Sequence, residues 1–512
     1  MKHYINICLI ALSLLTSCND YLDTIPSKGD NEVLNSSEQI EALFNNNSLF
    51  NAKASMIVAE SDDNGMSVDM YDSLGYASDN YLNGLTYNIE DIKNYPYGDN
   101  IWENEYNKVF TANLIINNID EITDLTPIKR IDFLAQAHFI RALALWNLAN
   151  IYCLPYAKEN LLLPGLPLKT TTSYEENVKR TSIKDTYNFI LADLQEALNT
   201  TKNDIDKRWL VSKPAAEAML SRFYLFTQDY TQAAKYAAMA LKSNKASLQD
   251  YNELTTVETT LQKPNSDEQA DVNYSELYSY SANEMTEYKE NYYSQFFTVE
   301  SGIYLIPSDN LMSIYDKDND LRYQQFFNKH GLWEIGIGGF GEDIIYHKFH
   351  TNISGDQIQS GPTVPEILLT EAEALARSGK YKEAMSYVNQ LRIARMKKDT
   401  ENTTLTAENQ QDAVEKILEE RHREMPFAMR WFDIRRLAFN ETTFDDITVK
   451  RTFYDVQNDI TNTDVIYQYT LPVKSKRYAQ PITKKEITRS SGQIEQNEYD
   501  NNSVIQTSNN NN

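Results

Sequence analysis

The chain has 512 residues, of which 41% are hydrophobic and 24% are charged, a composition typical of a folded globular protein and not of a disordered, collagen-like or polytopic membrane protein. Lysine and arginine total 48 against 73 aspartate and glutamate residues, for a formal net charge of -25, so we expect no nucleic-acid partner. Tyrosine is abundant, with 34 residues against 5 tryptophans, and its rigid ring and hydrogen-bonding tip favour polar recognition.

The N-terminus has the pattern of an export signal. A short basic segment, Met1–His3, precedes an apolar run at Ile5–Leu15, so we predict a signal peptide at residues 1–17. As a helix this run reaches only about 16 Å, which is too short for the ~30 Å hydrocarbon core of a membrane.

A cysteine follows the apolar run directly. The segment Leu15–Cys18 resembles a bacterial lipobox, which predicts lipidation of Cys18 and a polar, lipidated tether at residues 18–35. Acyl chains on one residue would hold the protein on a membrane without a spanning helix. An ordinary cleavage site with a chance cysteine is the alternative. Cys153 would then be the one cysteine outside the signal and anchor, which excludes an intramolecular disulfide.

Helical spacing of apolar residues follows the tether. The pattern predicts helices over Ile101–Ile122 and Ile131–Tyr152, because apolar residues recur three and four positions apart. A third helix includes Tyr187–Leu198, and either Thr181 or Ser182 is expected to cap it.

Two further segments share one pattern. Pro214–Leu241 and Glu366–Leu391 each have a small turn, then a tyrosine, then small residues on a second helix, which resembles a tetratricopeptide repeat. The two tyrosines, Tyr230 and Tyr381, are 151 residues apart. The copies are therefore not tandem, and we expect a large insert to interrupt any superhelix.

Composition divides the rest of the chain. We predict one domain over residues 36–512, with a helical scaffold at about 36–245 and 364–440. The intervening insert at about 246–360 is rich in tyrosine, asparagine, serine and glycine, has short strand-like pieces, and is the predicted ligand-binding part. Towards the C-terminus, Tyr467–Val473 is expected to form a strand, and the polar tail at about 490–512 is expected to be disordered.

Two charged patterns in the sequence resemble chemical sites. Glu420 and Glu424 lie four residues apart beside basic neighbours, which favours ion pairing between helices over acid–base catalysis. The segment Asp316–Asp320 alternates aspartates like a calcium loop, but Leu321 and Phe327 replace the glycine and glutamate of an EF-hand. We therefore predict no catalytic residue, no metal site and no cofactor, and leave open only a calcium site of another kind.

The candidate binding residues are aromatic and short polar side chains in two segments without helical periodicity, together with Trp333. These segments, residues 60–97 and 274–297, show no pattern that would direct their aromatics into a core. Aromatic faces suit the C–H faces of sugar rings, and short polar groups suit their hydroxyls. Ordinary packing of each ring is the alternative. The predicted ligand-binding residues are Asp63, Tyr71, Tyr76, Asn80, Tyr81, Tyr288, Tyr293 and Trp333.

Several of these motifs together resemble those of one family, the SusD/RagB outer-membrane lipoproteins of Bacteroidetes. The most specific is Ile417–Arg436 (ILEERHREMPFAMRWFDIRR), which is similar to the family's ERxxE and RWxDxRR ending, although Met425 and Pro426 depart from it. Similar positions also occur at Cys18–Asp23, Trp102–Tyr106, Phe139–Ala142 and Thr370–Arg392.

The resemblance implies a mainly α fold, a tetratricopeptide-repeat-like helical superhelix with an irregular, loop-rich and short-strand insert. It also implies a lipid-anchored protein on the outer face of the outer membrane. Such a protein captures an oligosaccharide and delivers it to a SusC-like TonB-dependent barrel, without covalent chemistry. Three alternatives stay open: a RagB-like peptide receptor, a pure scaffold for the transporter, and a surface glycosidase, which needs two carboxylates about 5 to 9.5 Å apart.

Overall fold

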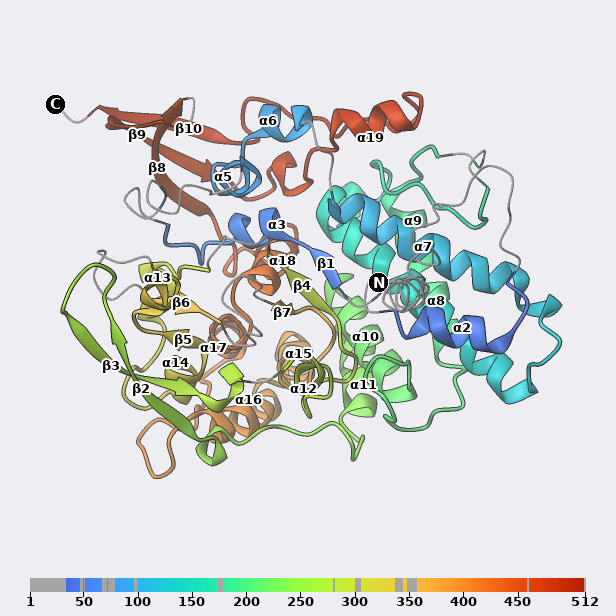
Figure 1. Ribbon diagram of the computed structural model, residues 1–512, viewed down its shortest axis with the longest axis horizontal. Helices are drawn as coiled ribbons and strands as arrows, with labels where there is room; N and C mark the ends of the chain where they lie inside the picture. Colours follow the sequence, from blue (N-terminus) through green and yellow to red (C-terminus); the bar gives the residue numbers. More distant parts are fainter. Residues whose placement is uncertain are drawn as a thin grey trace, which may run out of the picture.

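The computed structural model shows a helical body on which two smaller strand-containing parts are mounted (Figure 1). The predicted signal peptide, Cys18, most of the tether and Tyr76 lie outside the described residues. The described residues are 34–46, 49, 51–66, 71, 79–95, 100–173, 176, 178–279, 281–299, 305–336, 344–347, 357–457 and 460–510.

Long helices form most of the body. Their bounds are α2 Ser37–Phe44, α7 Asn100–Asn118, α8 Pro127–Tyr152, α9 Ile183–Ala197, α10 Lys213–Phe226, α11 Tyr230–Ala240, α15 Val364–Arg377, α16 Tyr381–Arg395, α17 Gln410–Glu424 and α18 Ala428–Leu437. The sequence predicted most of these within a few residues. Ser182 caps α9 as expected, because its side chain accepts from the Asp185 backbone N–H. Within the described part of the chain, no helix is long and apolar enough to cross a membrane.

The two repeat-like helix pairs pack directly on each other. Helix α10 contacts α11, α11 contacts α15, and α15 contacts α16 and α17, so the stack continues from α7 to α17. The expectation that the insert interrupts the superhelix is therefore wrong in space, because the insert leaves the stack after α11 and returns at α15. The fold is the predicted helical, tetratricopeptide-like one.

The turns inside the two pairs have the same backbone geometry. Gln228, two residues before Tyr230, has a φ of 64°, and Gly379, two residues before Tyr381, has a φ of 84°. Left-handed backbone at this position ends the first helix and reverses the chain. Gln228 holds this conformation without the freedom of glycine. Its side-chain amide Nε2 donates to the Tyr156 carbonyl at 3.2 Å.

The insert consists of short elements beside the helical stack. Its strands are β2 Thr256–Gln262, β3 Gln269–Ser275, β4 Phe296–Thr298, β5 Phe327–Asn328, β6 Ile345–Tyr346 and β7 Gln357–Gln359, and its helices are α12 Ala282–Thr286, α13 Asp309–Ser313 and α14 Leu321–Phe326. Strands β2 and β3 form an antiparallel hairpin, and β5 pairs with β6. The strand order β1-β4-β7 ties the insert to the N-terminal segment, since β1 Asn51–Lys53 runs parallel to β4.

The C-terminal part adds a three-stranded antiparallel sheet of order β10-β9-β8. Its strands are β8 Val449–Gln457, β9 Ile460–Leu471 and β10 Ile505–Asn510. The predicted strand is the end of β9. The expectation of a disordered tail is wrong for residues 505–510, because their backbone pairs with β9 from Ile505↔Thr470 to Asn510↔Val465.

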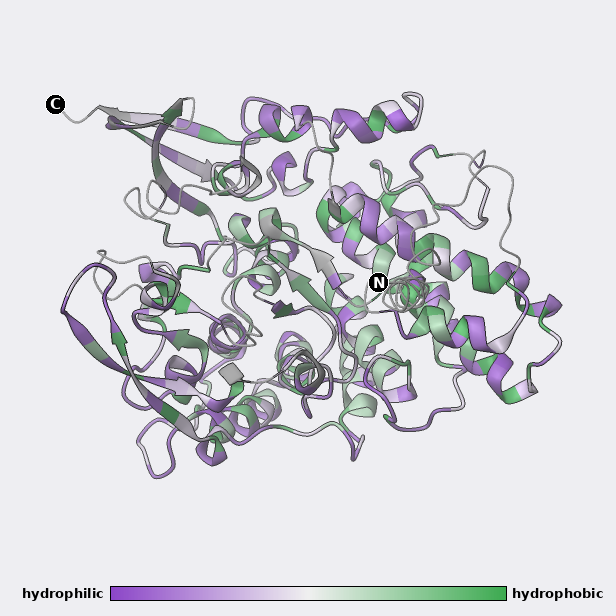
Figure 2. Cartoon of the chain, viewed as in Figure 1, coloured by the Kyte–Doolittle hydropathy of each residue, from purple (hydrophilic) through white to green (hydrophobic). Residues whose placement is uncertain are grey.

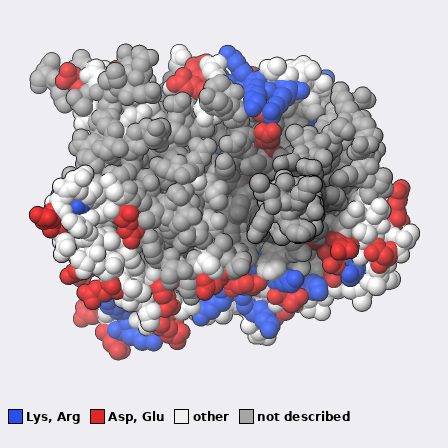
Figure 3. Space-filling model, viewed as in Figure 1, with Lys and Arg blue, Asp and Glu red and all other residues white. Residues whose placement is uncertain are grey.

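Three short helices lie between this sheet and the body. Their bounds are α3 Ser55–Glu60, α5 Asp79–Leu85 and α6 Ile89–Asn94, and α19 Lys484–Arg489 lies near them in Figure 1. Helix α3 packs on α18 and α5. The largest apolar core lies in the helical body, and the outer sheet is largely hydrophilic (Figure 2). Acidic and basic side chains alternate along the lower edge in Figure 3, and basic side chains gather at the position of α19.

Candidate ligand-binding surfaces

The aromatic residues predicted to bind ligand are mostly buried. Tyr81 is 0% exposed and Tyr293 is 1% exposed. The Tyr81 hydroxyl donates to the Asn64 side-chain oxygen. The Tyr293 ring packs edge-on against Phe139, with centroids 4.7 Å apart. These rings fill space between the N-terminal segment, the insert and the helices.

The other predicted aromatics have similar surroundings. Tyr71 packs edge-on against Phe453 at 5.7 Å, Tyr288 belongs to a small apolar cluster with Leu277, and Trp333 is 5% exposed. The expectation that these rings have no core to enter is wrong, because loops between helices and strands form part of the core here. Their contact with ligand stays a prediction, as does that of Tyr76 and of the Asn80 side chain, which lie outside the description.

Asp63, predicted as a polar ligand contact, is an internal anchor in the structure. It is fully buried; one carboxylate oxygen lies 2.5 Å from His422 Nε2, and the other accepts from the Phe427 backbone N–H at 2.5 Å. Its neighbour Asp62 accepts two hydrogen bonds from Arg430, at 2.9 and 2.8 Å. These contacts fasten the N-terminal segment to the start of α18.

Asp62, Asp63 and His422 are the one group of described residues close enough together to hold a metal ion. Burial raises the pKa of Asp62, but the Arg430 guanidinium outweighs it and lowers the pKa to about 2. The carboxylate is thus already neutralised by a protein cation. This arrangement is typical of a structural ion-pair cluster.

The acidic pair of α17 is also engaged in ion pairs. Glu420 lies 2.7 Å from Arg322 and 2.8 Å from Arg392, and Glu424 lies 3.0 Å from Arg395. Burial raises the pKa of Glu420, but these guanidinium groups overcome it and lower the pKa to about 2. A carboxylate held in this ionised state is a poor proton donor near neutral pH. The predicted structural role of the pair is confirmed.

The arginine-rich end of the same motif completes the network. Asp433 pairs with Arg421 at 3.1 Å and with Arg436 at 2.7 Å, and Arg436 reaches Glu373 on α15 at 2.7 Å. Arg435 donates to two backbone carbonyls, those of Tyr478 and Cys153. The motif thus links α15, α17, α18 and the loop after α8.

The aspartate-rich segment before α14 is a turn and a helix cap. The Asp316 carboxylate accepts from the Asn319 side chain at 2.9 Å. Asp320 is the N-cap of α14 and pairs with Arg322 at 2.7 Å. Two of the three aspartates therefore have local protein partners.

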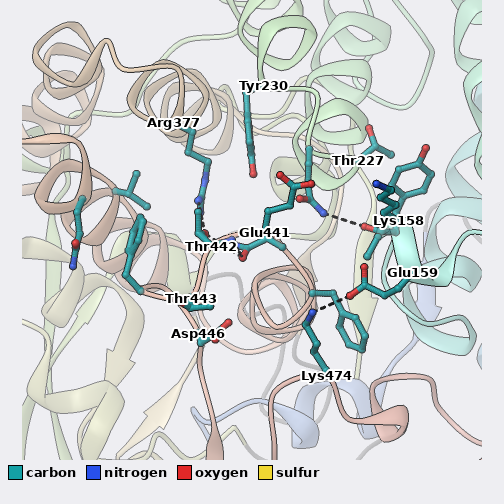
Figure 4. A pocket seen from close by; sticks show the side chains of 18 of the residues that line it. Lys158, Glu159, Thr227, Tyr230, Arg377, Glu441, Thr442, Thr443, Asp446 and Lys474 are labelled. Carbon is teal, nitrogen blue, oxygen red and sulfur yellow. Dashed lines mark hydrogen bonds and ion pairs between the residues drawn. The ribbon is translucent and has the colours of Figure 1, made fainter.

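One open cavity lies at the ends of the repeat helices (Figure 4). This helix-end cavity has a volume of about 710 Å³ and lies between the loop after α10, the end of α15, the start of α17 and residues 439–446. Arg377 covers one aromatic face, since its guanidinium carbon lies 5.5 Å from the Tyr230 ring centroid. It also pairs with Asp445 at 2.6 Å, and Lys474 pairs with Glu159 at 3.0 Å across the mouth.

A second open cavity lies under the C-terminal sheet. This sheet cavity has a volume of about 590 Å³ and is bounded by α5, α6, the three strands β8 to β10 and residues 499–504. Four half-buried tyrosines line it, together with short amides and carboxylates. The tyrosines are Tyr454, Tyr467, Tyr469 and Tyr499.

These tyrosines were not predicted from the sequence, although part of the signal was present. The pattern predicts a strand over Tyr467–Val473, and in a strand Tyr467 and Tyr469 must point to the same side. The pairing of β10 with β9 was not predicted, because residues 505–510 are polar and lack a hydrophobic pattern. Without β10 only the β8–β9 hairpin remains, and the cavity lacks the lining residue Gln506.

Two family models match separate parts of the chain. One, described as "Starch-binding associating with outer membrane", matches residues 20–225, and the other, "SusD family", matches residues 351–499. SusD-like protein P2 of Formosa agariphila is 25% identical over 403 residues, covering 69% of this chain and 76% of the relative. SusD-like protein P25 of the same organism is 29% identical over 85 residues, 16% of each chain.

Solved structures share the fold across nearly the whole chain. A SusD-like protein from Bacteroides fragilis aligns with a TM-score of 0.63 and 18% identity, covering 91% of this chain and 98% of that one. A SusD-like carbohydrate binding protein from Bacteroides vulgatus aligns with a TM-score of 0.58 and 17% identity, covering 90% and 97%. At these identities the likeness concerns the fold alone.

Proposed function

The chain belongs to the SusD/RagB family, and on that premise we propose that it captures an oligosaccharide at the cell surface and delivers it to a SusC-like TonB-dependent barrel. The observation that carries this proposal is the match of residues 20–225 to a family described as starch-binding and associated with the outer membrane. The second match, at residues 351–499, includes the buried charged motif that organises the scaffold. The two matches lie on either side of the insert.

The arrangement of the molecule suits capture without covalent chemistry. The helical stack is rigid, and recognition of a mobile polymer needs a rigid surface with aromatic and short polar groups. A glycosidase would need one carboxylic acid that stays protonated near neutral pH beside an ionised partner. Glu420, with its pKa lowered to about 2, is the opposite case. Burial and the neighbouring Glu383 raise the pKa of Glu371 to about 7, but Glu371 lines neither the helix-end cavity nor the sheet cavity.

The proposal includes lipidation of Cys18, which follows from the Leu15–Cys18 sequence. A surface receptor that feeds a membrane barrel must stay beside it, and acyl chains supply that attachment. Cys18→Ala should move the protein from the membrane pellet to the soluble fraction. Cells that lack the partner barrel are the test strain, because binding to the barrel could otherwise retain the variant. Unchanged retention in those cells would contradict lipid anchoring.

The binding function is tested by calorimetry of the purified chain against oligosaccharides and against peptides of similar length. Saturable heat with at least one oligosaccharide and none with peptides is the expected result. Saturable heat with peptides alone would favour a RagB-like peptide receptor. Delivery is tested by affinity purification from the native membrane, which should recover a TonB-dependent barrel with the tagged protein.

A further inference from the structure

The sheet cavity has aromatic walls that are fixed in place. Tyr467 and Tyr469 point to one side of β9, and their ring centroids lie 6.2 Å apart at an interplanar angle of 59°. Tyr469 packs partly against the buried cluster of Tyr71, Leu85 and Phe453. Because that cluster immobilises the inner ring, a ligand stacking on this wall gives up little side-chain entropy.

The opposite wall carries a third ring. The Tyr499 hydroxyl donates to the Ala479 carbonyl at 2.9 Å, which fixes the ring at the mouth of the cavity. The Lys93 ammonium lies 5.3 Å from the centroid of that ring and pairs with Glu90 at 2.8 Å. The cavity is therefore lined by tyrosines from two separate segments of the chain.

Polar groups with short side chains surround these rings. Gln506, the register partner of Tyr469 on β10, is exposed at the cavity, and Asn501 is exposed on the adjoining turn. Asp91 and Asn88 add a carboxylate and an amide from the start of α6. Flat rings interleaved with short amides and carboxylates match the C–H faces and hydroxyl edges of a sugar.

The charge of the lining selects among sugars. Four carboxylates, those of Glu90, Asp91, Asp455 and Asp500, line the cavity. Among the described lining residues Lys93 is the one lysine or arginine, and it pairs with Glu90, while Asp500 pairs at 3.4 Å with Lys476 outside the lining, so the four carboxylates still outnumber the nearby cations. A uronic acid or sulfate group would meet an excess of like charge here. A neutral sugar can use the same carboxylates as hydrogen-bond acceptors.

The helix-end cavity is a weaker candidate for the same ligand, although it is larger. Its best-placed ring, Tyr230, is covered by the Arg377 guanidinium. That guanidinium is in turn held by Glu373 at 2.8 Å and by Asp445 at 2.6 Å. A sugar would have to displace these ion pairs before it could stack on the ring.

We propose that the sheet cavity is a binding site for a neutral oligosaccharide, with Tyr467 and Tyr469, which share one face of β9, as stacking surfaces. The proposal rests on the proposed function, because it takes glycan capture as given and names the site and the charge class. The cavity volume of about 590 Å³ lies within the range of roughly 300 to 1,000 Å³ that is usual for small-molecule sites. One or a few sugar units of a longer chain would enter it.

The experiment uses the purified full chain in detergent. Calorimetry is run with four neutral oligosaccharides, maltohexaose, cellohexaose, xylohexaose and mannohexaose, and with tetragalacturonate as the anionic probe. The variants are Tyr467→Ala, Tyr469→Ala and the double variant. Tyr236→Ala is the matched control, because Tyr236 is also half-buried, but it lies on the repeat helix α11 and stacks on Tyr224 of α10 at 5.6 Å.

We expect the parent to bind a neutral probe and not tetragalacturonate. Each cavity variant should raise Kd about two- to ten-fold, which is the range expected for one aromatic stacking contact, and the double variant more. Tyr236→Ala should bind like the parent, and Tyr467→Phe, which keeps the ring, should restore most of the affinity. Melting temperatures of all variants are measured to confirm folding.

The outcomes separate the two proposals. If the parent binds none of the probes, the proposed glycan capture fails for these sugars, and the site assignment fails with it. If the parent binds a neutral probe but the double variant matches Tyr236→Ala, only the site assignment is overturned. Binding of tetragalacturonate that depends on Tyr467 would overturn the neutral class while keeping the site.

Discussion

Two tyrosine-rich regions of this molecule have opposite surroundings. The first, around Tyr81, Tyr87 and Tyr293, lies in the core, where each ring is at most 1% exposed. The second, around Tyr467 and Tyr469, lines the sheet cavity with half-buried rings. Both regions come from segments without helical periodicity, so the density of tyrosine does not distinguish a core from a surface.

Hydroxyl partners explain how the core accommodates some of its tyrosines. The Tyr81 hydroxyl donates to Asn64, the Tyr87 hydroxyl to the Glu60 carbonyl at 2.8 Å, and the Tyr292 hydroxyl to the Ala240 carbonyl at 3.1 Å. A buried tyrosine with such a partner contributes its full apolar area without leaving a polar group unpaired. A partner is not required of every buried tyrosine, because the hydroxyls of Tyr152, Tyr251 and Tyr478 have no hydrogen-bond partner within the described part of the chain.

The largest expected effect tests the core region through Trp431. Its ring is 1% exposed and stacks on Tyr87 at 6.2 Å and on Tyr478 at 5.6 Å. Trp431→Ala should lower the free energy of unfolding by about 3 to 5 kcal/mol, measured by denaturant titration. Trp209→Ala removes a half-buried ring that also has a hydrogen-bond partner, and it should cost clearly less. Equal losses of unfolding free energy in the two variants would show that the buried Trp431 ring stabilises the fold no more than the half-buried Trp209 ring.

A second test uses acid, because ion pairs hold the core region together. Glu420 has a pKa of about 2 against an ordinary 4.5, so folding favours its ionised form. The resulting stability, on the order of 3 kcal/mol, is present above about pH 4.5 and is lost as pH falls towards 2. Hydrogen exchange at pH 3 should therefore increase in α17 and α18 more than in β8 to β10.

The matched control for the acid test lies on the same helix. Asp412 pairs with Lys416 at 2.8 Å near the start of α17, in a partly exposed position. Asp412→Asn should leave the pH dependence of the melting temperature unchanged, because exposed pairs contribute little. Glu420→Gln should flatten the decline below pH 4.5 while lowering the melting temperature at pH 7. A decline that stays as steep in Glu420→Gln would exclude Glu420 as its source.

A single hydroxyl tests the same comparison on a smaller scale. Tyr81→Phe removes the donor to Asn64 and leaves a buried amide oxygen without it, so the free energy of unfolding should fall by about 1 to 3 kcal/mol. Tyr467→Phe makes the same chemical change in the sheet cavity and should change stability by less than about 0.5 kcal/mol. Chemical denaturation of both variants measures the difference directly.

The sequence contained enough to predict the helical scaffold. Ser182 and the turn before Tyr230 mark helix ends by local chemistry, and local chemistry is readable without the fold. The charged motif at Ile417–Arg436 was correctly predicted as structural. Its partners were not, because Arg322 and Arg392 lie far from it in sequence and are brought to Glu420 only by the packing of α14 and α16 against α17.

The candidate site was harder to predict, for the same physical reason. Burial of Tyr81 or Trp333 depends on contacts between segments that are distant in sequence, and no local pattern reports them. The sheet cavity depends on β10, whose residues 505–510 become a strand only because β9 offers paired backbone groups. A polar sequence at an edge strand carries little signal of its own.

Removal of a whole ring makes the sharpest distinction between the two regions. Tyr467→Ala removes a half-buried ring from the middle strand of the outer sheet, so it should cost about 1 kcal/mol, the usual span of strand preference. Tyr81→Ala, assayed beside it, empties a fully buried site and should cost several times more. If both variants lost the same stability, the Tyr467 ring would be a core element, and a ligand could not use it without unfolding the sheet. If Tyr467→Ala is nearly neutral, the ring is available for stacking, since its presence there is not required for folding.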